Sequence, residues 1–135
     1  MTSNAVIVIA DSDSTWVESM VRLLETEGYR VLAARNGVDA LYQTRMRRPD
    51  LLLLNPDLPQ LSGWEVCRRV KRLPGDQWTK VAMLTLQGDA AYRAGADGYL
   101  VKSGNVEPTL PPIRVFRHPA QGILEEFLHR RAVAA

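Results

Sequence analysis

Two runs of four residues, each made only of branched aliphatic side chains, constrain the fold of this chain more than any other feature. They are residues 6–9 (VIVI) and 51–54 (LLLL), and each is followed closely by polar residues. A run so short and so uniformly apolar is typical of a strand that is covered on both faces, as in a parallel sheet. Pro49 and Pro56, which bound the second run, favour a strand over a helix there. We therefore expect a parallel sheet with helices on both sides.

Helical patterns alternate with further short apolar segments along the chain. The expected strands cover residues 6–9, 29–33, 51–54, 81–85 and 98–101, and the expected helices begin near residues 14, 38, 62 and 90. This alternation predicts a doubly wound α/β fold with right-handed crossovers. Ser14 or Thr15 is expected to cap the first helix, and Gly28 to end it. Ser62, three residues before Glu65, predicts a capping box at the third helix.

The composition fits one ordinary globular domain. The chain has 135 residues, of which 46% are hydrophobic and 24% charged, with a formal net charge of +2, so it is long enough to bury its own core. No apolar run approaches the ~20 residues of a membrane span, and the amino terminus does not resemble a signal peptide. We expect a cytoplasmic protein without membrane association. The single cysteine, Cys67, lies on an apolar helical stripe and is interpreted as a core residue.

Basic residues gather in two short segments of the chain. Arg45, Arg47 and Arg48 form one cluster, and the other holds Arg68, Arg69, Lys71 and Arg72. We interpret both as solvated helix faces whose charges suit the carboxyl ends of helices. The alternative is a docking patch for an acidic partner. The overall charge is too balanced to predict nucleic-acid binding.

Polar residues follow the expected strands, at the edge of the sheet where ligands bind in folds of this class. They are Asp11, Ser12 and Asp13 after the first strand, Asn55 and Asp57 after the third, Thr85 after the fourth and Lys102 after the fifth. The chain has neither a Gly-x-Gly-x-x-Gly nor a Gly-x-x-x-x-Gly-Lys-Ser/Thr motif, which argues against nucleotide binding. His118 and His129 lack neighbours at metal-ligand spacing and are interpreted as surface residues.

Five segments of the sequence together resemble the receiver domain of bacterial response regulators. The segments are VIVIADSD, LLETEGY, PDLLLLNPDLPQLSGWEV, VAMLT and AGADGYLVK, which lie in the family's order between about residue 5 and residue 102. The resemblance implies a flavodoxin-like fold whose five parallel strands lie in the order 2-1-3-4-5. It also implies two-component signalling, in which a histidine kinase phosphorylates an aspartate after the third strand and acidic residues help to hold Mg²⁺.

The resemblance assigns a role to each residue at the strand ends. The phospho-acceptor position is Asn55, and the acidic pair after the first strand is Asp11 and Ser12. Thr85 and Lys102 correspond to the residues that bind the phosphoryl group.

The departures from the family pattern decide the expected chemistry. Asn55 carries a neutral amide and cannot form an acyl phosphate. Ser12 removes a second carboxylate, so we expect no more than weak Mg²⁺ binding, by Asp11 and Asp57 at most. Asp13 or Asp57 is the alternative source of a substitute carboxylate.

The side chains of the altered pocket are expected to pair with one another. Lys102, which loses its usual acidic partner, is expected to pair with Asp11. Asn55 is expected to donate or accept a hydrogen bond with Thr85 or Lys102, which would fix one conformation of the pocket.

The sequence therefore predicts a pseudo-receiver that has no catalytic activity and signals without aspartyl phosphorylation. Its expected partner is a protein, such as a histidine kinase or a downstream regulator, or a second copy of itself in a homodimer. One alternative is a phosphotransfer receiver that uses Asp57 or Asp11 as a surrogate acceptor. Another is a sensor of a small anion or ligand that uses the vacated pocket. No helix-turn-helix pattern follows residue 102, so we expect no nucleic-acid partner.

Further departures lie outside the pocket. The segment between Thr85 and Lys102 is short for the family, which predicts a shortened fourth helix. Tyr99 occupies the position of an aromatic residue that turns inward on activation in the family. We divide the chain into a receiver-like core (1–102), a proline-rich connection (103–120) and a carboxyl-terminal helix (121–135) packed on the core.

Overall fold

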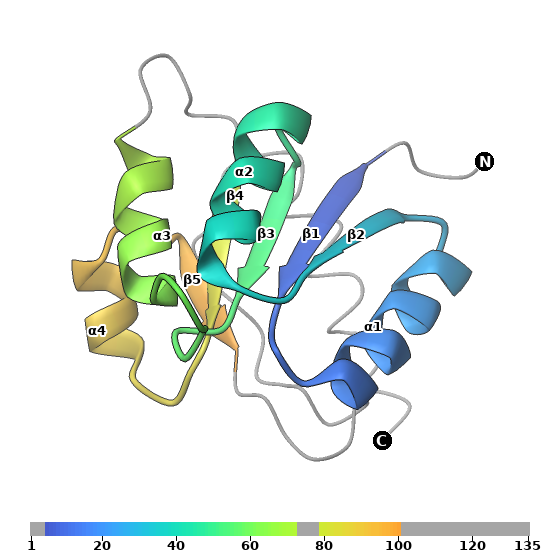
Figure 1. Ribbon diagram of the computed structural model, residues 1–135, viewed down its shortest axis with the longest axis horizontal. Coiled ribbons are helices and arrows are strands. Elements are labelled where there is room, and N and C mark those ends of the chain that lie inside the picture. Colours follow the sequence, from blue (N-terminus) through green and yellow to red (C-terminus); the bar gives the residue numbers. More distant parts are fainter. Residues whose placement is uncertain (1–4, 73–78, 101–135) are drawn as a thin grey trace.

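The computed structural model describes residues 5–72 and 79–100, and within them five strands alternate with four helices. The strands are β1 (Val6–Ala10), β2 (Arg30–Ala34), β3 (Leu51–Leu54), β4 (Lys80–Leu84) and β5 (Gly98–Leu100). The helices are α1 (Ser14–Thr26), α2 (Gly37–Arg47), α3 (Gly63–Lys71) and α4 (Gly88–Arg93). All strands are parallel and lie in the order β2-β1-β3-β4-β5 (Figure 1). This confirms the predicted doubly wound fold and its strand order.

The sheet separates two hydrophobic cores. Figure 1 shows α1 on one face of the sheet and α2, α3 and α4 on the other. In β3, Leu51 and Leu53 pack in the core with α1, whereas Leu52 and Leu54 pack in the core with the other helices. Because side chains alternate across a strand, a strand that is covered on both faces must be apolar at every position. This explains why residues 51–54 are all leucine.

The other predicted elements are confirmed, with small shifts at their ends. β2 covers Arg30–Ala34 rather than 29–33, and β4 covers Lys80–Leu84 rather than 81–85. The shortened fourth helix is confirmed as α4, which has six residues and begins at Gly88. Within the described ranges, no helix combines the length and apolar character needed to cross a membrane. The predicted connection (103–120) and carboxyl-terminal helix (121–135) lie outside the described residues.

The cap of α1 differs from the prediction. Asp13, rather than Ser14 or Thr15, accepts a hydrogen bond from the Trp16 backbone N–H, at 3.1 Å. All three residue types serve well as caps, so the backbone decides which one is used. Asp13 is still extended, with φ −79° and ψ 98°, whereas Ser14 already belongs to the helix.

Two other predicted helix boundaries are confirmed. At the start of α3, the hydroxyl oxygen of Ser62 accepts a hydrogen bond from the backbone N–H of Glu65, at 3.3 Å. At the end of α1, Gly28 follows the cap residue Glu27 and has a φ of 97°. Glycine adopts this left-handed conformation without strain, and it is the usual residue at this place.

Two aspartates from the motifs that resemble receivers hold the sheet together at the amino ends of its strands. Asp50, which precedes β3, accepts a hydrogen bond at Oδ2 from the Val6 backbone N–H, at 2.8 Å. Asp97, which precedes β5, accepts one from the Val81 N–H at 2.9 Å and pairs with Lys71 at 2.5 Å. Charge-assisted bonds of this kind are among the stronger ones in proteins. Both carboxylates therefore have a structural role, far from the carboxyl ends of the strands.

Candidate functional site

The carboxyl ends of β1 and β3 place Asp11 and Asn55 side by side. The two strands are in register, with Ala10 opposite Leu54. One residue further along, the Asn55 backbone N–H donates to the Ala10 carbonyl at 2.9 Å, and the Asp11 N–H donates to the carbonyl of Ala34 at 3.0 Å. The sheet ladder therefore fixes the backbone of both residues at the edge where the site was predicted.

The side chains of these two residues bond directly to each other. Asn55 Nδ2 donates to Asp11 Oδ2 at 3.0 Å. The other carboxylate oxygen, Oδ1, accepts a hydrogen bond from the Asp13 backbone N–H at 2.9 Å. Asp11 is only 1% exposed, and a carboxylate buried to this extent needs such donors. The amide supplies one of them at a position where a second carboxylate would repel the first.

Asn55 is fixed on its other side by the loop that follows β3. Its Oδ1 accepts a hydrogen bond from the Asp57 backbone N–H at 2.8 Å. The start of α3 presses on its main chain, because a Cβ added at Gly63 would lie 2.1 Å from the Asn55 carbonyl oxygen. The Gly63 N–H donates to the Pro56 carbonyl at 2.9 Å. Only a residue without a side chain fits at this close approach.

Of the remaining acidic-pocket positions, Asp13 contacts Asp11 through its backbone N–H. Ser12, Asp13 and Asp57 are exposed, and the Asp13 carboxylate caps α1. Asp57 reaches Asn55 through its backbone rather than through its carboxylate. Among residues 5–72 and 79–100, no three His, Cys, Asp or Glu side chains are grouped so that they could hold a metal ion.

Thr85 lies at the end of β4, where its hydroxyl group is bonded locally. Its Oγ1 accepts a hydrogen bond from the Gln87 backbone N–H at 3.0 Å. Its own backbone N–H donates to the Leu100 carbonyl at 2.8 Å, which continues the pairing of β4 with β5. The hydroxyl therefore stabilises the turn into α4.

Of the two partners predicted for Asn55, Thr85 is not the one found. Asn55 bonds Asp11 and the backbone of Asp57, because a buried carboxylate is a stronger acceptor than a hydroxyl. The alternative partner, Lys102, lies outside the described residues, so that hydrogen bond stays a prediction, as does the pairing of Lys102 with Asp11.

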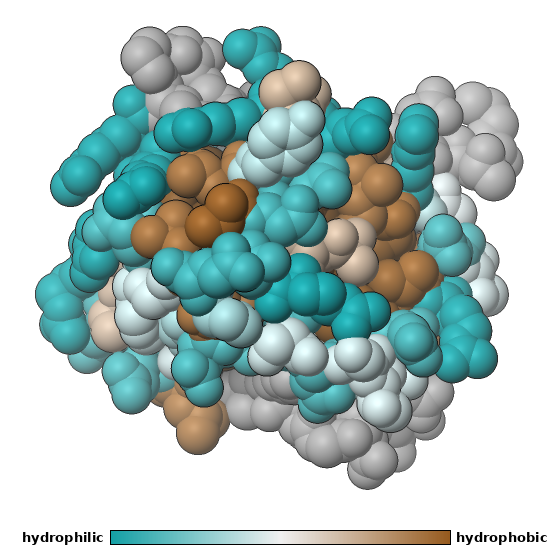
Figure 2. Space-filling view, viewed as in Figure 1, coloured by the Kyte–Doolittle hydropathy of each residue, from teal (hydrophilic) through white to brown (hydrophobic). Residues whose placement is uncertain are grey.

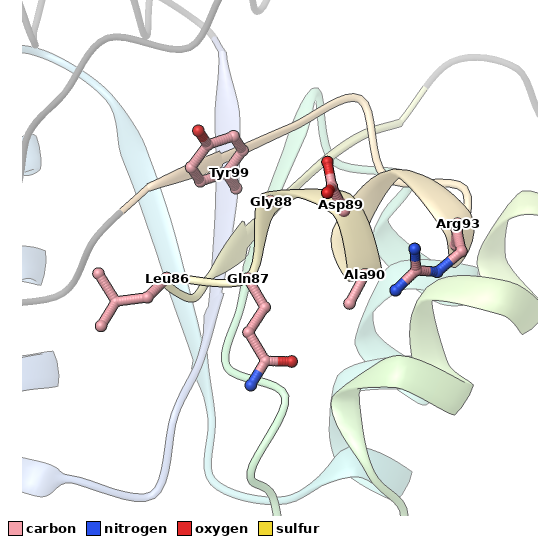
Figure 3. A pocket seen from close by; sticks show the side chains of 7 residues that line it. All are labelled: Leu86, Gln87, Gly88, Asp89, Ala90, Arg93 and Tyr99. Atoms are coloured by element: carbon pink, nitrogen blue, oxygen red, sulfur yellow. The ribbon is translucent and has the colours of Figure 1, made fainter.

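Tyr99 lies on β5, beside an open hollow of about 480 Å³ at the start of α4. Its ring covers Gly88 (Figure 3), so closely that a Cβ added to Gly88 would lie 2.6 Å from the ring carbon Cε1. Tyr92 meets the same ring edge to face, with centroids 6.0 Å apart. Asp89 and Arg93 bring charge to the hollow. Tyr99 is thus packed against α4 at the rim of a polar hollow.

Gly88 and Tyr92 are two site residues that sequence reasoning missed. Gly88 and Tyr92 lie on α4 whereas Tyr99 lies on β5, so their contacts depend on how two elements pack, and spacing within one element does not predict them. The signal that could have found Gly88 is its place at the start of a shortened helix, where a neighbouring strand can approach closely.

Cys67 is a core residue, as predicted. It is fully buried, and its Sγ donates to the Ala94 carbonyl at 3.4 Å. Burial raises the pKa of the thiol from 9.0 to about 11. Because the thiolate is the reactive form of cysteine, Cys67 is not a nucleophile at neutral pH.

Comparison with known proteins points to a single family. The family model of the response regulator receiver domain matches residues 7–110. The response regulator MprA of Mycobacterium leprae is 39% identical over 113 residues, which cover 80% of this chain and 49% of that protein. MprA of Mycobacterium tuberculosis is 36% identical over 113 residues, covering 80% and 48%. The N-terminal domain of a response regulator receiver protein from Methanoculleus marisnigri is 30% identical, with a TM-score of 0.68, over 76% of this chain and 87% of that one. The chain spans about half the length of the curated relatives it matches.

Proposed function

The chain belongs to the response regulator receiver domain family, and on this premise we propose that it signals by binding a protein partner without being phosphorylated on aspartate. The observation that carries this proposal is the hydrogen bond from the Asn55 amide to Asp11. The proposed partner is a histidine kinase or a downstream regulator, with a homodimer as the alternative. The proposed module has no catalytic activity of its own and no nucleic-acid partner.

The chemistry of Asn55 supports a role without phosphorylation. Transfer to a receiver aspartate needs an anionic carboxylate oxygen that attacks phosphorus, displaces the phosphoryl donor and becomes the bridging oxygen of an acyl phosphate. An amide has no such oxygen, and the lone pair of its nitrogen is delocalised into the carbonyl. The Asn55 amide donates to Asp11 and accepts from the backbone of Asp57, so both of its polar atoms serve to hold the pocket together.

The residues around Asn55 do not fit the Mg²⁺ that the family resemblance implies. Protein sites for Mg²⁺ usually supply one or two carboxylates in near-octahedral geometry. Among the described residues, Asp11 is the one buried acidic side chain, and each of its oxygens already accepts a hydrogen bond. Ser12 and Asp57 are exposed. These observations support weak binding at most.

The surface around Tyr99 supports a role in protein binding. Leu86 is 80% exposed and Tyr92 is 43% exposed, and both lie near the hollow that Tyr99 borders. Exposed apolar and aromatic side chains beside polar groups are typical of interaction surfaces. Tyr99, which packs on Gly88, forms part of this surface.

Intact mass after incubation with Mg²⁺ and acetyl phosphate tests the proposal. We expect the native chain to stay unmodified, and we expect the matched variant Asn55→Asp to gain one phosphoryl group. A native chain that gains a stable phosphoryl group would overturn the proposal. If neither protein is modified, restoring the aspartate at position 55 is not enough to restore phosphorylation. Ser12→Asp in the Asn55→Asp background then becomes the informative variant.

Phosphotransfer through a surrogate acceptor is the second candidate function. The exposure of Asp57, which lies two residues beyond Asn55 and bonds it through its backbone, favours Asp57 as that acceptor. If the native chain gains a phosphoryl group, Asp57→Ala or Asp11→Ala should abolish it. A sensor of a small anion that uses Thr85 and Lys102 is tested in the same samples, because a ligand that binds only the folded state raises the melting temperature.

A further inference from the structure

One side of α2 carries an apolar stripe that faces away from the core. Val38, Tyr42 and Met46 are 52%, 60% and 63% exposed, and their spacing of four residues places them on one side of the helix. The buried side of the same helix holds Ala40 and Thr44. Five large hydrophobic side chains are exposed in the described part of the chain, and this stripe contributes three of them. Apolar exposure is therefore concentrated on α2.

The stripe borders a hollow between α2 and α3, which we name the α2–α3 groove. Besides the stripe, its lining residues are Leu41, Leu61, Arg45 and Arg69, and its volume is about 300 Å³. Figure 2 shows hydrophobic side chains gathered between α2 and α3, with hydrophilic ones around them. The volume is at the lower end of the range for small-molecule sites, roughly 300–1,000 Å³. The groove therefore suits one or two apolar side chains better than a cofactor.

The rim of the groove is basic. Glu65 pairs with Arg68 at 3.7 Å and with Arg69 at 3.3 Å, so one carboxylate serves two guanidinium groups, and Arg45 adds a third at the groove. Exposed ion pairs of this kind contribute about 1 kcal/mol or less. Carboxylates of a partner can therefore replace or supplement Glu65 at little cost.

We propose that the α2–α3 groove binds an acidic amphipathic helix of a protein partner. The helix would insert apolar side chains between Tyr42 and Met46 and place carboxylates against Arg45 and Arg69. Tyrosine and arginine are enriched among the residues that dominate binding energy, and methionine adapts to irregular partners. This proposal rests on the protein-binding role proposed above. It adds a second surface, separate from the one around Tyr99, and the chemistry of the partner that fits it.

Charge favours this occupant over a second copy of the chain. In a two-fold symmetric dimer the same patch meets itself, so Arg45 and Arg69 of one copy would face those of the other. Like charges that meet in this way oppose association. The chain's own segment 121–135, which contains Glu125 and Glu126 among apolar residues, is the intramolecular alternative that the experiment must distinguish.

The probe is a pair of synthetic helical peptides titrated into the full chain. Each peptide is blocked at both ends and about 15 residues long, with leucine and phenylalanine on one face. The first peptide carries glutamates beside that face, and the second carries lysines at the same positions. Methyl NMR of ¹³C-labelled methionine follows binding, because Met46 is exposed in the groove whereas Met20 and Met83 are buried. We expect the acidic peptide to shift the Met46 signal and the basic peptide to leave it unchanged.

Matched variants test whether the acidic peptide binds at the α2–α3 groove. Arg45→Glu combined with Arg69→Glu is expected to weaken the acidic peptide at least about tenfold, and Tyr42→Ser about fivefold or more. Arg47→Glu changes the same residue type in the same last turn of α2, but Arg47 does not line the groove. The affinity of this variant for the acidic peptide should therefore stay within about twofold of the native value.

Several outcomes would overturn the proposal. Equal binding of both peptides, or equal loss in Arg47→Glu, would show nonspecific attraction. A Met46 signal that moves with protein concentration alone would show self-association, and one that moves in Phe127→Ser without peptide would show that segment 121–135 fills the groove. Phosphorylation by acetyl phosphate would contradict the proposed function but would not change these titrations, so the two failures are distinguishable.

Discussion

The amide nitrogen of Asn55 lies 3.0 Å from Oδ2 of Asp11, and this hydrogen bond joins the ends of two neighbouring strands. A neutral donor stabilises a buried carboxylate, whereas two carboxylates at this distance repel each other unless a cation lies between them. The pair therefore ties the carboxyl end of β3 to that of β1.

Replacing Asn55 by aspartate is expected to lower the free energy of unfolding at neutral pH by about 1–3 kcal/mol. The variant loses the donor and sets a second carboxylate beside Asp11, and the two like charges repel each other. Denaturant unfolding at neutral pH measures the loss. Millimolar Mg²⁺ should raise the melting temperature of the variant more than that of the native chain, and equal shifts would contradict this account.

Replacing Asp11 by alanine is expected to lower the free energy of unfolding by about 2–4 kcal/mol. The change leaves the Asn55 amide and the Asp13 N–H without the acceptor that they share. Urea unfolding followed by circular dichroism measures the loss. Ser12→Ala, at the exposed next position, is the matched control and should change stability by less than about 0.5 kcal/mol. Similar losses in both variants would mean that the turn, rather than the buried carboxylate, matters.

Gly88→Ala should have opposite effects in two backgrounds. With Tyr99 present, the new Cβ meets the ring at 2.6 Å, and we expect a loss of about 1 kcal/mol as the ring moves. In a Tyr99→Ala background the contact is gone, and alanine in a helix should stabilise by about 0.5–1 kcal/mol. A double-mutant cycle from thermal unfolding measures the coupling. Equal effects in both backgrounds would show that Tyr99 does not rest on Gly88.

The thiol of Cys67 should remain protonated, and unreactive, well into the alkaline range. Burial raises its pKa from 9.0 to about 11 in the folded chain. Between these values the unfolded chain releases the proton and the folded chain keeps it, so stability is intact below pH 9.0 and falls as the pH rises towards about 11. Denaturant unfolding across this range measures the slope. In Cys67→Ala this part of the slope should be absent, and an unchanged slope would assign it to other groups.

The sheet could be predicted from the sequence because strands that are buried on both faces consist almost entirely of apolar residues. Leu51–Leu54 is apolar at every position since both faces of β3 are covered. The capping residue of α1 could not be predicted from the sequence in the same way. Asp13, Ser14 and Thr15 are all good caps, and the turn after β1 selects Asp13 by leaving it extended.

The candidate site was predictable in its residues and less so in its bonds. The strand ends placed Asp11 and Asn55 at the same edge of the sheet, and the register of β1 with β3 confirms this. The acceptor of the Asn55 amide depends on side-chain torsions that no sequence pattern records, so Thr85 or Lys102 was expected and Asp11 was found. The contact of Tyr99 with Gly88 depends on how closely α4 approaches β5, and sequence spacing does not reveal that distance.

The carboxylates that hold the strands and the carboxylate of the pocket lie at opposite edges of the sheet. Asp50 and Asp97 bond the amino ends of the strands, whereas Asp11 and Asn55 meet at the carboxyl ends. Residues of the pocket can therefore vary without removing the hydrogen bonds of Asp50 and Asp97, which join neighbouring strands at the other edge.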